Sequence, residues 1–330
     1  MSLTSRTRRA GTFAAAAITL GLAAGALTAC SSDASATGDD DGSLSIALLA
    51  FDTTNPWVAT LVSGAESKAD ELDIDLTVSN ANYDNAAQIA QVQDAVAKGV
   101  DAIIIQAADA DGIVPAVNQA TEAGIAVFAV NANVGDGAEV VSFVGADQSQ
   151  MGVGAAELVK EAVPDGGAVA LIQGAVGNPI STVRTEGFTE TLGEWPEYEI
   201  VATVTDNFTS DENLAVVQDL LAKYPAGQLD AIVAQGGQLY VGAEYAASIG
   251  RDDVAFIAND YPIQVRDAIV AGQIFGTVNQ DGALQGSSAV EAAFNWLTGN
   301  QDAVQRPTQY IDLPLVTQDN VADFDTTWRS

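Results

Sequence analysis

The sequence contains no histidine, and Cys30 is its only cysteine. Metal sites built from imidazole or from several thiolates are therefore excluded, as is acid–base catalysis that depends on histidine. A calcium loop of the Asp-x-Asp-x-Asp-Gly type is also missing from the sequence. We accordingly predict a protein with no metal site and no cofactor.

Basic residues are scarce as well. Lysine and arginine together number 12, against 44 aspartate and glutamate residues, and the formal net charge is −32. Such a surface repels phosphate backbones, so nucleic acid is excluded as a partner.

The N-terminal segment has a different composition from the rest of the chain. Residues 1–29 contain three arginines and no acid, and their apolar run over 14–29 ends in Leu-Thr-Ala directly before Cys30. A basic start, a short apolar core and small residues before a cleavage point are typical of an export signal, here of the bacterial lipoprotein kind. We predict that 1–29 are removed and that acylated Cys30 anchors the chain to the outer face of the cytoplasmic membrane. The alternative is an uncleaved anchor followed by a buried core cysteine. The small, acidic stretch 30–43 then forms a flexible tether.

Beyond the tether, short β-rich runs alternate with longer amphipathic ones. Near-continuous apolar strands separated by helices indicate a parallel sheet covered on both faces. Because the alternation occurs in two successive series, we predict an α/β fold of two doubly wound parallel-sheet lobes joined by a hinge. The expected strands are 44–51, 75–81, 101–107, 125–132, 168–174, 198–208, 229–237 and 252–260. The expected helices are 55–72, 85–99, 111–124, 181–195, 213–225 and 241–250.

In doubly wound sheets, a ligand binds outside the carboxyl ends of the strands. The segments that follow the expected strands are rich in amides and carboxylates, with one arginine and two aromatic residues among them. These segments are 52–57, 106–111, 131–133, 174–184, 207–208, 235–238 and 259–260. Hydrogen-bonding groups beside flat apolar faces suit a polyhydroxylated ligand.

Several motifs recur in the same order and spacing in a known family. They are "NPWVATLVSGAESKADEL" at 55–72, "VQDAVAKGVDAIII" at 92–105, "VRTEGF" at 183–188 and "GQIFGTVNQ" at 272–280. Over about 44–299 the chain therefore resembles the periplasmic sugar-binding proteins of ABC importers, in the ribose/galactose-type subgroup. The resemblance implies the type I periplasmic-binding-protein fold. The expected N-terminal lobe is 44–146 plus 281–308, and the expected C-terminal lobe is 147–280 plus 309–330.

The resemblance also implies ligand contacts from both lobes. The first lobe would supply two polar contacts and an aromatic ring that lies against the sugar, namely Asn55, Asn131 and Trp57. The second lobe and the hinge would supply an arginine, an aromatic wall, a carboxylate and an amide, namely Arg184, Phe208, Asp260 and Gln280.

Each of these residues also has a purely structural interpretation. Asn55 could serve only as the cap of a helix that begins at Pro56. The others could be core aromatics (Trp57, Phe208), a surface charge (Arg184), a turn residue (Asp260) or solvated loop amides (Asn131, Gln280).

Departures from the family pattern bear on the identity of the ligand. Ala132 stands where ribose binders carry an arginine, which disfavours ribose. Gly236 and Gly237 stand where relatives carry an asparagine or aspartate, so one polar contact of hexose binders is missing. Phe51 replaces a small polar residue. Sugar alcohols, deoxy or modified pentoses and signalling molecules such as autoinducer-2 all stay admissible.

We therefore predict a monomeric substrate-binding lipoprotein that captures a sugar or polyol by hinge closure and delivers it to an ABC permease with its ATPase subunit. It would not be an enzyme. One alternative is a ligand-sensing lobe for chemotaxis or quorum signalling, which shares the fold and the pocket. The other is a secreted carbohydrate-active enzyme with a pair of carboxylates, such as Asp260 with Asp52 or Asp109.

Overall fold

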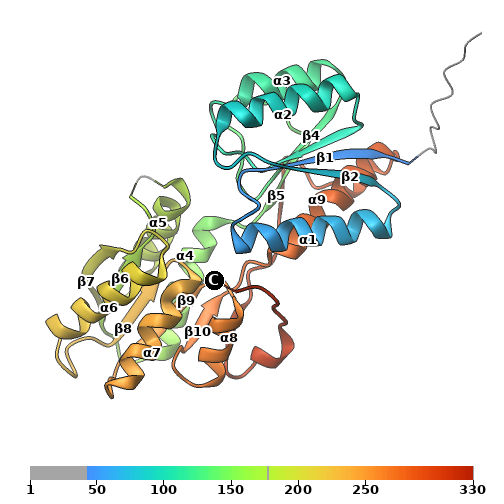
Figure 1. The fold of residues 1–330 in the computed structure, drawn as a ribbon. Helices are drawn as coiled ribbons and strands as arrows, with labels where there is room; N and C mark the ends of the chain where they lie inside the picture. The colour runs from blue at the N-terminus through green and yellow to red at the C-terminus, as the bar shows by residue number, and fades with distance from the viewer. Residues whose placement is uncertain (1–42, 177, 330) are drawn as a thin grey trace, which may run out of the picture. The chain divides into compact units, whose positions relative to one another are not determined.

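The computed structural model describes residues 43–176 and 178–329. The predicted signal peptide, the lipidation residue Cys30 and almost all of the predicted tether lie outside these ranges. Within them, two sheets carry helices on their faces, which confirms the predicted α/β architecture of two parallel-sheet lobes (Figure 1). No helix in the described ranges is both long and apolar enough to cross a membrane.

The first sheet consists of parallel strands. Its strands, in spatial order, are β11 (Thr308–Tyr310), β5 (Ser142–Gly145), β4 (Ala126–Val130), β3 (Ala102–Ile105), β1 (Ser45–Ala50) and β2 (Asp75–Asn80). Its helices are α1 (Pro56–Glu71), α2 (Asn85–Lys98), α3 (Val114–Glu122) and α9 (Gly282–Leu297). The 3-10 turn η2 spans Gln301–Ala303.

Side-chain alternation along β1 shows why this sheet is covered on both faces. Ile46 and Leu48 pack with α1 and α9 on one face, whereas Ala47 and Leu49 pack with α2 and α3 on the other. Figure 1 shows the two helix pairs on opposite sides of the sheet. A strand that is buried on both faces must be apolar at nearly every position, which is the pattern seen in the sequence.

The second sheet repeats this plan with one difference. Its strands, in spatial order, are β12 (Leu315–Thr317), β10 (Gly276–Val278), β9 (Ala255–Asn259), β8 (Ala231–Ala234), β6 (Gly167–Gln173) and β7 (Tyr198–Thr205). Its helices are α4 (Gln148–Ala162), α5 (Pro179–Gly193), α6 (Ser210–Lys223), α7 (Tyr240–Ser248) and α8 (Ile263–Val270), with 3-10 turns η1 (Gly237–Leu239) and η3 (Val321–Asp323). The edge strand β12 runs antiparallel to β10, and the other pairs are parallel.

The chain passes between the sheets more than once. It leaves the first sheet after β5, returns after β10 and leaves again after β11. Since β11 ends at Tyr310, residues 309 and 310 pair within the first sheet. Of the strands that flank these passages, β5, β10, β11 and β12 are only three or four residues long.

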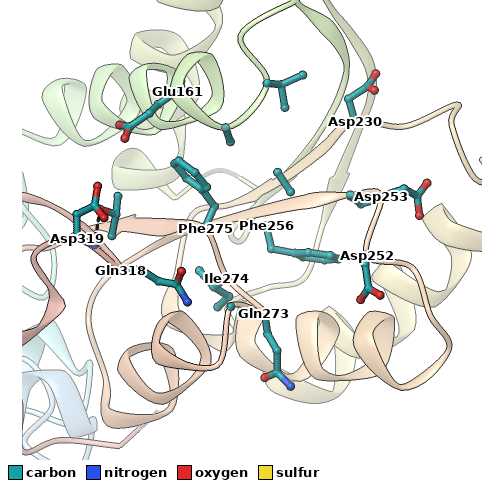
Figure 2. Close-up of a pocket in the computed structure, with 16 residues that line it drawn as sticks. Glu161, Asp230, Asp252, Asp253, Phe256, Gln273, Ile274, Phe275, Gln318 and Asp319 are labelled. Atoms are coloured by element: carbon teal, nitrogen blue, oxygen red, sulfur yellow. Dashed lines mark hydrogen bonds between the residues drawn. The ribbon is translucent and has the colours of Figure 1, made fainter.

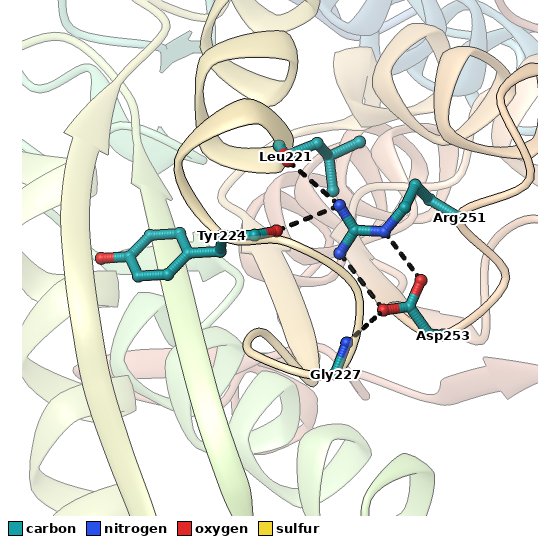
Figure 3. Close-up of polar contacts among 5 residues, drawn as sticks. All are labelled: Leu221, Tyr224, Gly227, Arg251 and Asp253. Carbon is teal, nitrogen blue, oxygen red and sulfur yellow. Dashed lines mark hydrogen bonds and ion pairs between the residues drawn. The ribbon is translucent and has the colours of Figure 1, made fainter.

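A charged brace secures the end of α6 in the second lobe (Figure 3). The Nη1 atom of Arg251 donates to the backbone oxygens of Leu221 and Tyr224, at 3.1 Å each. Its Nε and Nη2 atoms donate to Asp253 at 2.8 and 3.2 Å. The hydrogen bond from Arg251 is the main reason why the pKa of Asp253 falls to about 2. A cation at a helix C-terminus satisfies carbonyls that have no partner within the helix.

Candidate functional site

The strand order identifies one edge of each sheet as a candidate binding edge. In the first sheet β1 lies between β3 and β2, and in the second β6 lies between β8 and β7. The order in which the chain adds strands to the sheet reverses at these points, and ligands of such folds bind outside the carboxyl ends of the strands there. The predicted site residues follow the carboxyl ends of strands in the two sheets.

The segment after β1 places Asn55 and Trp57 at the start of α1. The Oδ1 atom of Asn55 accepts hydrogen bonds from the backbone N–H groups of Trp57 (2.9 Å) and Val58 (3.3 Å), so Asn55 does cap the helix. Trp57 is only 9% exposed and belongs to the core of the first lobe. Its indole N–H donates to the backbone oxygen of Gln280 at 3.3 Å. Little of the Trp57 ring is therefore available to a ligand.

A pair of buried amides stands at the ends of β3 and β4. Asn131 has a φ of 58°, a left-handed conformation that asparagine tolerates better than most residues. Its backbone N–H donates to the backbone oxygen of Val144, and its Oδ1 accepts from Gln106 Nε2 at 2.8 Å. Gln106 is fully buried, and its Oε1 has no hydrogen-bond partner among the described residues. Gln106 thus fixes the orientation of Asn131, whose amide group has the chemistry to bond a ligand hydroxyl.

In the second lobe, α5 buries Arg184 at the ends of β6 and β8. Arg184 is 3% exposed. Its Nε donates to Gln148 Oε1 at 2.8 Å, and its Nη1 donates to the backbone oxygen of Gln235 at 2.6 Å. The guanidinium is therefore a fixed, buried charge, and the surface-charge interpretation is wrong.

Asp260 follows β9 with a φ of 68°, and its backbone N–H donates to the backbone oxygen of Val278. Its Oδ1 accepts from Gln280 Nε2 at 2.8 Å, and Gln280 Oε1 accepts from Gln148 Nε2 at 3.2 Å. Since Gln148 also accepts from Arg184, one continuous chain of hydrogen bonds runs Arg184–Gln148–Gln280–Asp260. We call these four residues the polar chain.

The two charges of the polar chain perturb each other. Burial lowers the pKa of Arg184, and the carboxylate of Asp260 acts against that shift. Burial raises the pKa of Asp260, while Arg184 and the hydrogen bond from Gln280 act in the opposite direction. Each group thus stabilises the ionised form of the other in a desolvated place.

Phe208 lies outside the polar chain. It follows β7 with a φ of 59° and is 36% exposed. Its backbone N–H donates to Oδ1 of Asp206, a buried carboxylate whose pKa is raised mainly by that burial. The ring lies so close to Gly174, at the end of β6, that a Cβ there would overlap it. Phe208 is thus partly exposed, and it is held in place by its backbone and by a glycine.

The missing contact at Gly236 and Gly237 has a packing explanation. A Cβ at Gly236 would overlap the side chain of Gln238, and a Cβ at Gly237 would overlap the ring of Pro262. Gln238 itself is 6% exposed and donates to Asp206 Oδ2 at 2.7 Å. Gln238 therefore points to the carboxylate that positions Phe208, and its tight packing requires glycine before it.

Gln148 is the functional candidate that sequence reasoning missed. It is the first residue of α4, immediately after the cap Asp147. The preceding strand β5 reads Ser-Phe-Val-Gly and has only two large apolar residues, so its pattern is too weak to be recognised as a buried strand. The segment after it was for that reason not among the expected strand ends.

A cavity of about 450 Å³ lies at the opposite edge of the second sheet, where β8 and β9 begin. Figure 2 shows Asp230, Asp252 and Asp253 on the same side of the cavity as Phe256, whereas the ring of Phe275 lies on the other side, nearer Glu161. It contains none of the predicted site residues and lies at the amino ends of the strands. In the described ranges, no group of three or more histidine, cysteine, aspartate or glutamate side chains is arranged to hold a metal ion.

Comparison with known proteins agrees with the fold described above. Residues 46–301 match a family model described as "Periplasmic binding protein domain". The ribose import binding protein RbsB of Escherichia coli is 29% identical over 274 residues, which is 83% of this chain and 90% of that protein. The xylitol-binding protein of Mycolicibacterium smegmatis is 27% identical over 317 residues, or 96% of this chain and 87% of that protein.

A solved structure gives the same result. The solute-binding protein of an ABC transporter from Actinobacillus succinogenes, with bound D-allose, superposes with a TM-score of 0.75 at 25% identity. The superposition covers 85% of this chain and all of that one.

Proposed function

The chain belongs to the periplasmic binding protein domain family, and from this premise we propose that it is the extracytoplasmic substrate-binding component of an ABC importer for a sugar or polyol. The similar proteins bear names for ribose and xylitol, and the similar structure holds D-allose. The polar chain carries the proposal. It presents a guanidinium, a carboxylate and two amides at the binding edge of the second sheet.

These groups suit a ligand with several hydroxyls. A hydroxyl both donates and accepts, so a guanidinium can serve its oxygen while a carboxylate or amide oxygen accepts its proton. A ligand that lacks one of these hydroxyls leaves a buried protein group without a hydrogen-bond partner. The free-energy cost of that unpaired group discriminates against such a ligand. We keep the prediction that Ala132 disfavours ribose.

Capture would join the two binding edges by hinge closure. In this proposal Asn55 and Asn131 from the first lobe, with the 9% of Trp57 that is exposed, complete contacts that Arg184, Phe208, Asp260 and Gln280 begin. A ligand favours the closed state because it gains the second set of contacts only there. The moving bodies are those predicted from sequence, except that residues 309 and 310 move with the first sheet.

A thermal-shift screen of the purified chain from residue 31 against pentoses, hexoses, polyols and inositols tests the function. At a ligand concentration 100 times Kd, binding adds about 2.7 kcal/mol to the free energy of unfolding, so at least one compound should raise Tm clearly. NMR of that compound after incubation should show it chemically unchanged, as expected for a binding protein. If no compound moved Tm, or if the sugar were turned over, the proposal would be contradicted.

We also propose export, with attachment through acylated Cys30 and function as a monomer beside the permease. The sequence pattern of 1–30 supports the anchor. Full-length chain expressed in bacteria fed a labelled fatty acid should carry the label, and Cys30→Ala should not. A label that persists in Cys30→Ala would overturn the assignment.

A further inference from the structure

One edge strand of each sheet, β2 in the first and β7 in the second, is followed by the same unusual backbone conformation. After β2, Asn82 and Tyr83 have φ values of 51° and 57°, and after β7, Asn207 and Phe208 have φ values of 50° and 59°. Left-handed conformations are uncommon and unfavourable for bulky residues, so they persist only where the surroundings impose them. Tyr83 thus occupies in the first lobe the place that Phe208 occupies in the second.

The segment around Tyr83 is tied to the segment that follows β1. The backbone N–H of Tyr83 donates to the backbone oxygen of Phe51 at 2.7 Å. The backbone N–H of Thr53 donates to Asn80 Oδ1 at 3.2 Å. The ring of Tyr83 stacks on that of Phe51, with centroids 4.8 Å apart and planes 25° from parallel. Both rings therefore stand at the binding edge of the first sheet.

Tyr83 is also the more accessible aromatic residue there. It is 58% exposed, against 9% for Trp57. Its pKa is raised by burial and by the charge of Asp52, and a hydrogen bond with the side chain of Asn55 opposes the shift. The phenol thus lies beside a candidate ligand contact, while its ring is open to solvent.

Resting on the proposed function, we propose that Tyr83, supported by Phe51, is an aromatic wall of the ligand site in the first lobe and the counterpart of Phe208. Two facing walls bury two flat C–H faces at once. A ring-shaped ligand, such as a pyranose or a cyclitol, has two such faces, whereas an open-chain polyol does not. Tyr83 is therefore a specificity determinant that favours ring-shaped over open-chain ligands.

Two variants of Tyr83 distinguish the contribution of its ring to binding from the contributions of its backbone conformation and its hydroxyl. Tyr83→Asn removes the ring but keeps a residue that accepts the left-handed conformation, and Tyr83→Phe keeps the ring. Tyr310→Ala is a matched control, because Tyr310 is 56% exposed and lies on the opposite edge strand of the same sheet. The probes are D-allose, D-glucose and myo-inositol against xylitol and ribitol, measured by calorimetry.

The wild type should bind at least one ring-shaped probe more tightly than the open-chain ones. Tyr83→Asn should weaken that binding about three- to tenfold, the range expected for an aromatic contact, while open-chain binding changes less than twofold. Tyr83→Phe and Tyr310→Ala should both stay near the wild type.

Unchanged selectivity in Tyr83→Asn, or an equal loss for both classes, would overturn this proposal while leaving the proposed function intact. Tighter wild-type binding of an open-chain probe would overturn it as well. A wild type that binds no compound of the wider thermal-shift screen would contradict the proposed function and this inference with it.

Discussion

The two lobes prepare their binding edges by different means. In the second lobe, Arg184 and Asp260 are held by Gln148 and Gln280 in the polar chain. In the first lobe the buried groups of the edge are the neutral pair Asn131 and Gln106, and exposed aromatic surface lies beside the half-buried Asp52. Leaving a buried charge unpaired costs far more free energy than leaving a neutral amide unpaired, so the second lobe must hold its charged groups more firmly before a ligand arrives. We infer that most of the polar affinity resides in the second lobe.

Arg184→Ala should produce the largest effect. A hydrogen bond to a charged group contributes about 1.5–3 kcal/mol, so the Kd for the best sugar should rise between about tenfold and 150-fold in calorimetry. Arg184→Lys should not restore binding, because an ammonium cannot reproduce the guanidinium fork. Arg266→Ala serves as control, since Arg266 pairs with Asp267 on the surface. Unchanged affinity in Arg184→Ala would contradict the inference that most of the polar affinity resides in the second lobe.

Gln148→Leu should come next. Gln148 accepts from Arg184 and donates to Gln280, so its loss removes one of the two hydrogen bonds that hold the guanidinium. With about 1 kcal/mol for each of the two lost hydrogen bonds, the rise in Kd should reach at most about 30-fold. A double variant with Arg184→Ala should bind no more weakly than Arg184→Ala alone if Gln148 acts through the arginine. Additive losses would argue for an independent contact.

These two residues also mark the limits of what the sequence predicts. The apolar strands buried on both faces and the helices between them were predictable, because their apolar runs or helical periodicity are strong. The short strands β5, β10, β11 and β12 were not, and neither were α4, α8 and α9. Arg184 could be named from its motif, but Gln148 could not, because the strand before it, Ser-Phe-Val-Gly, has only two large apolar residues.

Burial explains the other differences at the site. Trp57 and Tyr83 cannot be ranked as ligand walls from sequence, since exposure depends on how α1 and α9 pack. The structure buries Trp57 and leaves Tyr83 exposed. Left-handed residues such as Asn131 and Asp260 become visible only with the backbone.

Asn131→Ala should have a smaller effect than either change in the polar chain. A neutral hydrogen bond contributes about 0.5–1.5 kcal/mol, so Kd should rise about two- to tenfold. The measurement is the same titration, with Asn118→Ala as control, because the hydrogen bonds of the Asn118 side chain in the described part of the structure go only to the loop at 137–139. A larger loss for Asn131→Ala than for Arg184→Ala would reverse the ranking of the lobes.

Asp253→Asn should have the smallest effect, and on stability alone. The pKa of Asp253 is about 2 in the folded protein, below its ordinary 3.8, so its ionised form stabilises the fold above pH 3.8. This stabilisation is lost as the pH falls from 3.8 towards 2. Exposed ion pairs contribute about 0.2–1 kcal/mol. Urea unfolding should therefore show the variant less stable by that amount at pH 6, with the difference shrinking below pH 4. A difference independent of pH would contradict the brace shown in Figure 3.

The position of the bound ligand tests the central claim most directly. A crystal structure with the sugar or polyol that gives the largest thermal shift should show its hydroxyls hydrogen-bonded to Arg184, Asp260 and Asn131, between the carboxyl ends of both sheets. A ligand seated instead in the acidic cavity at the amino ends of β8 and β9 (Figure 2) would contradict the account.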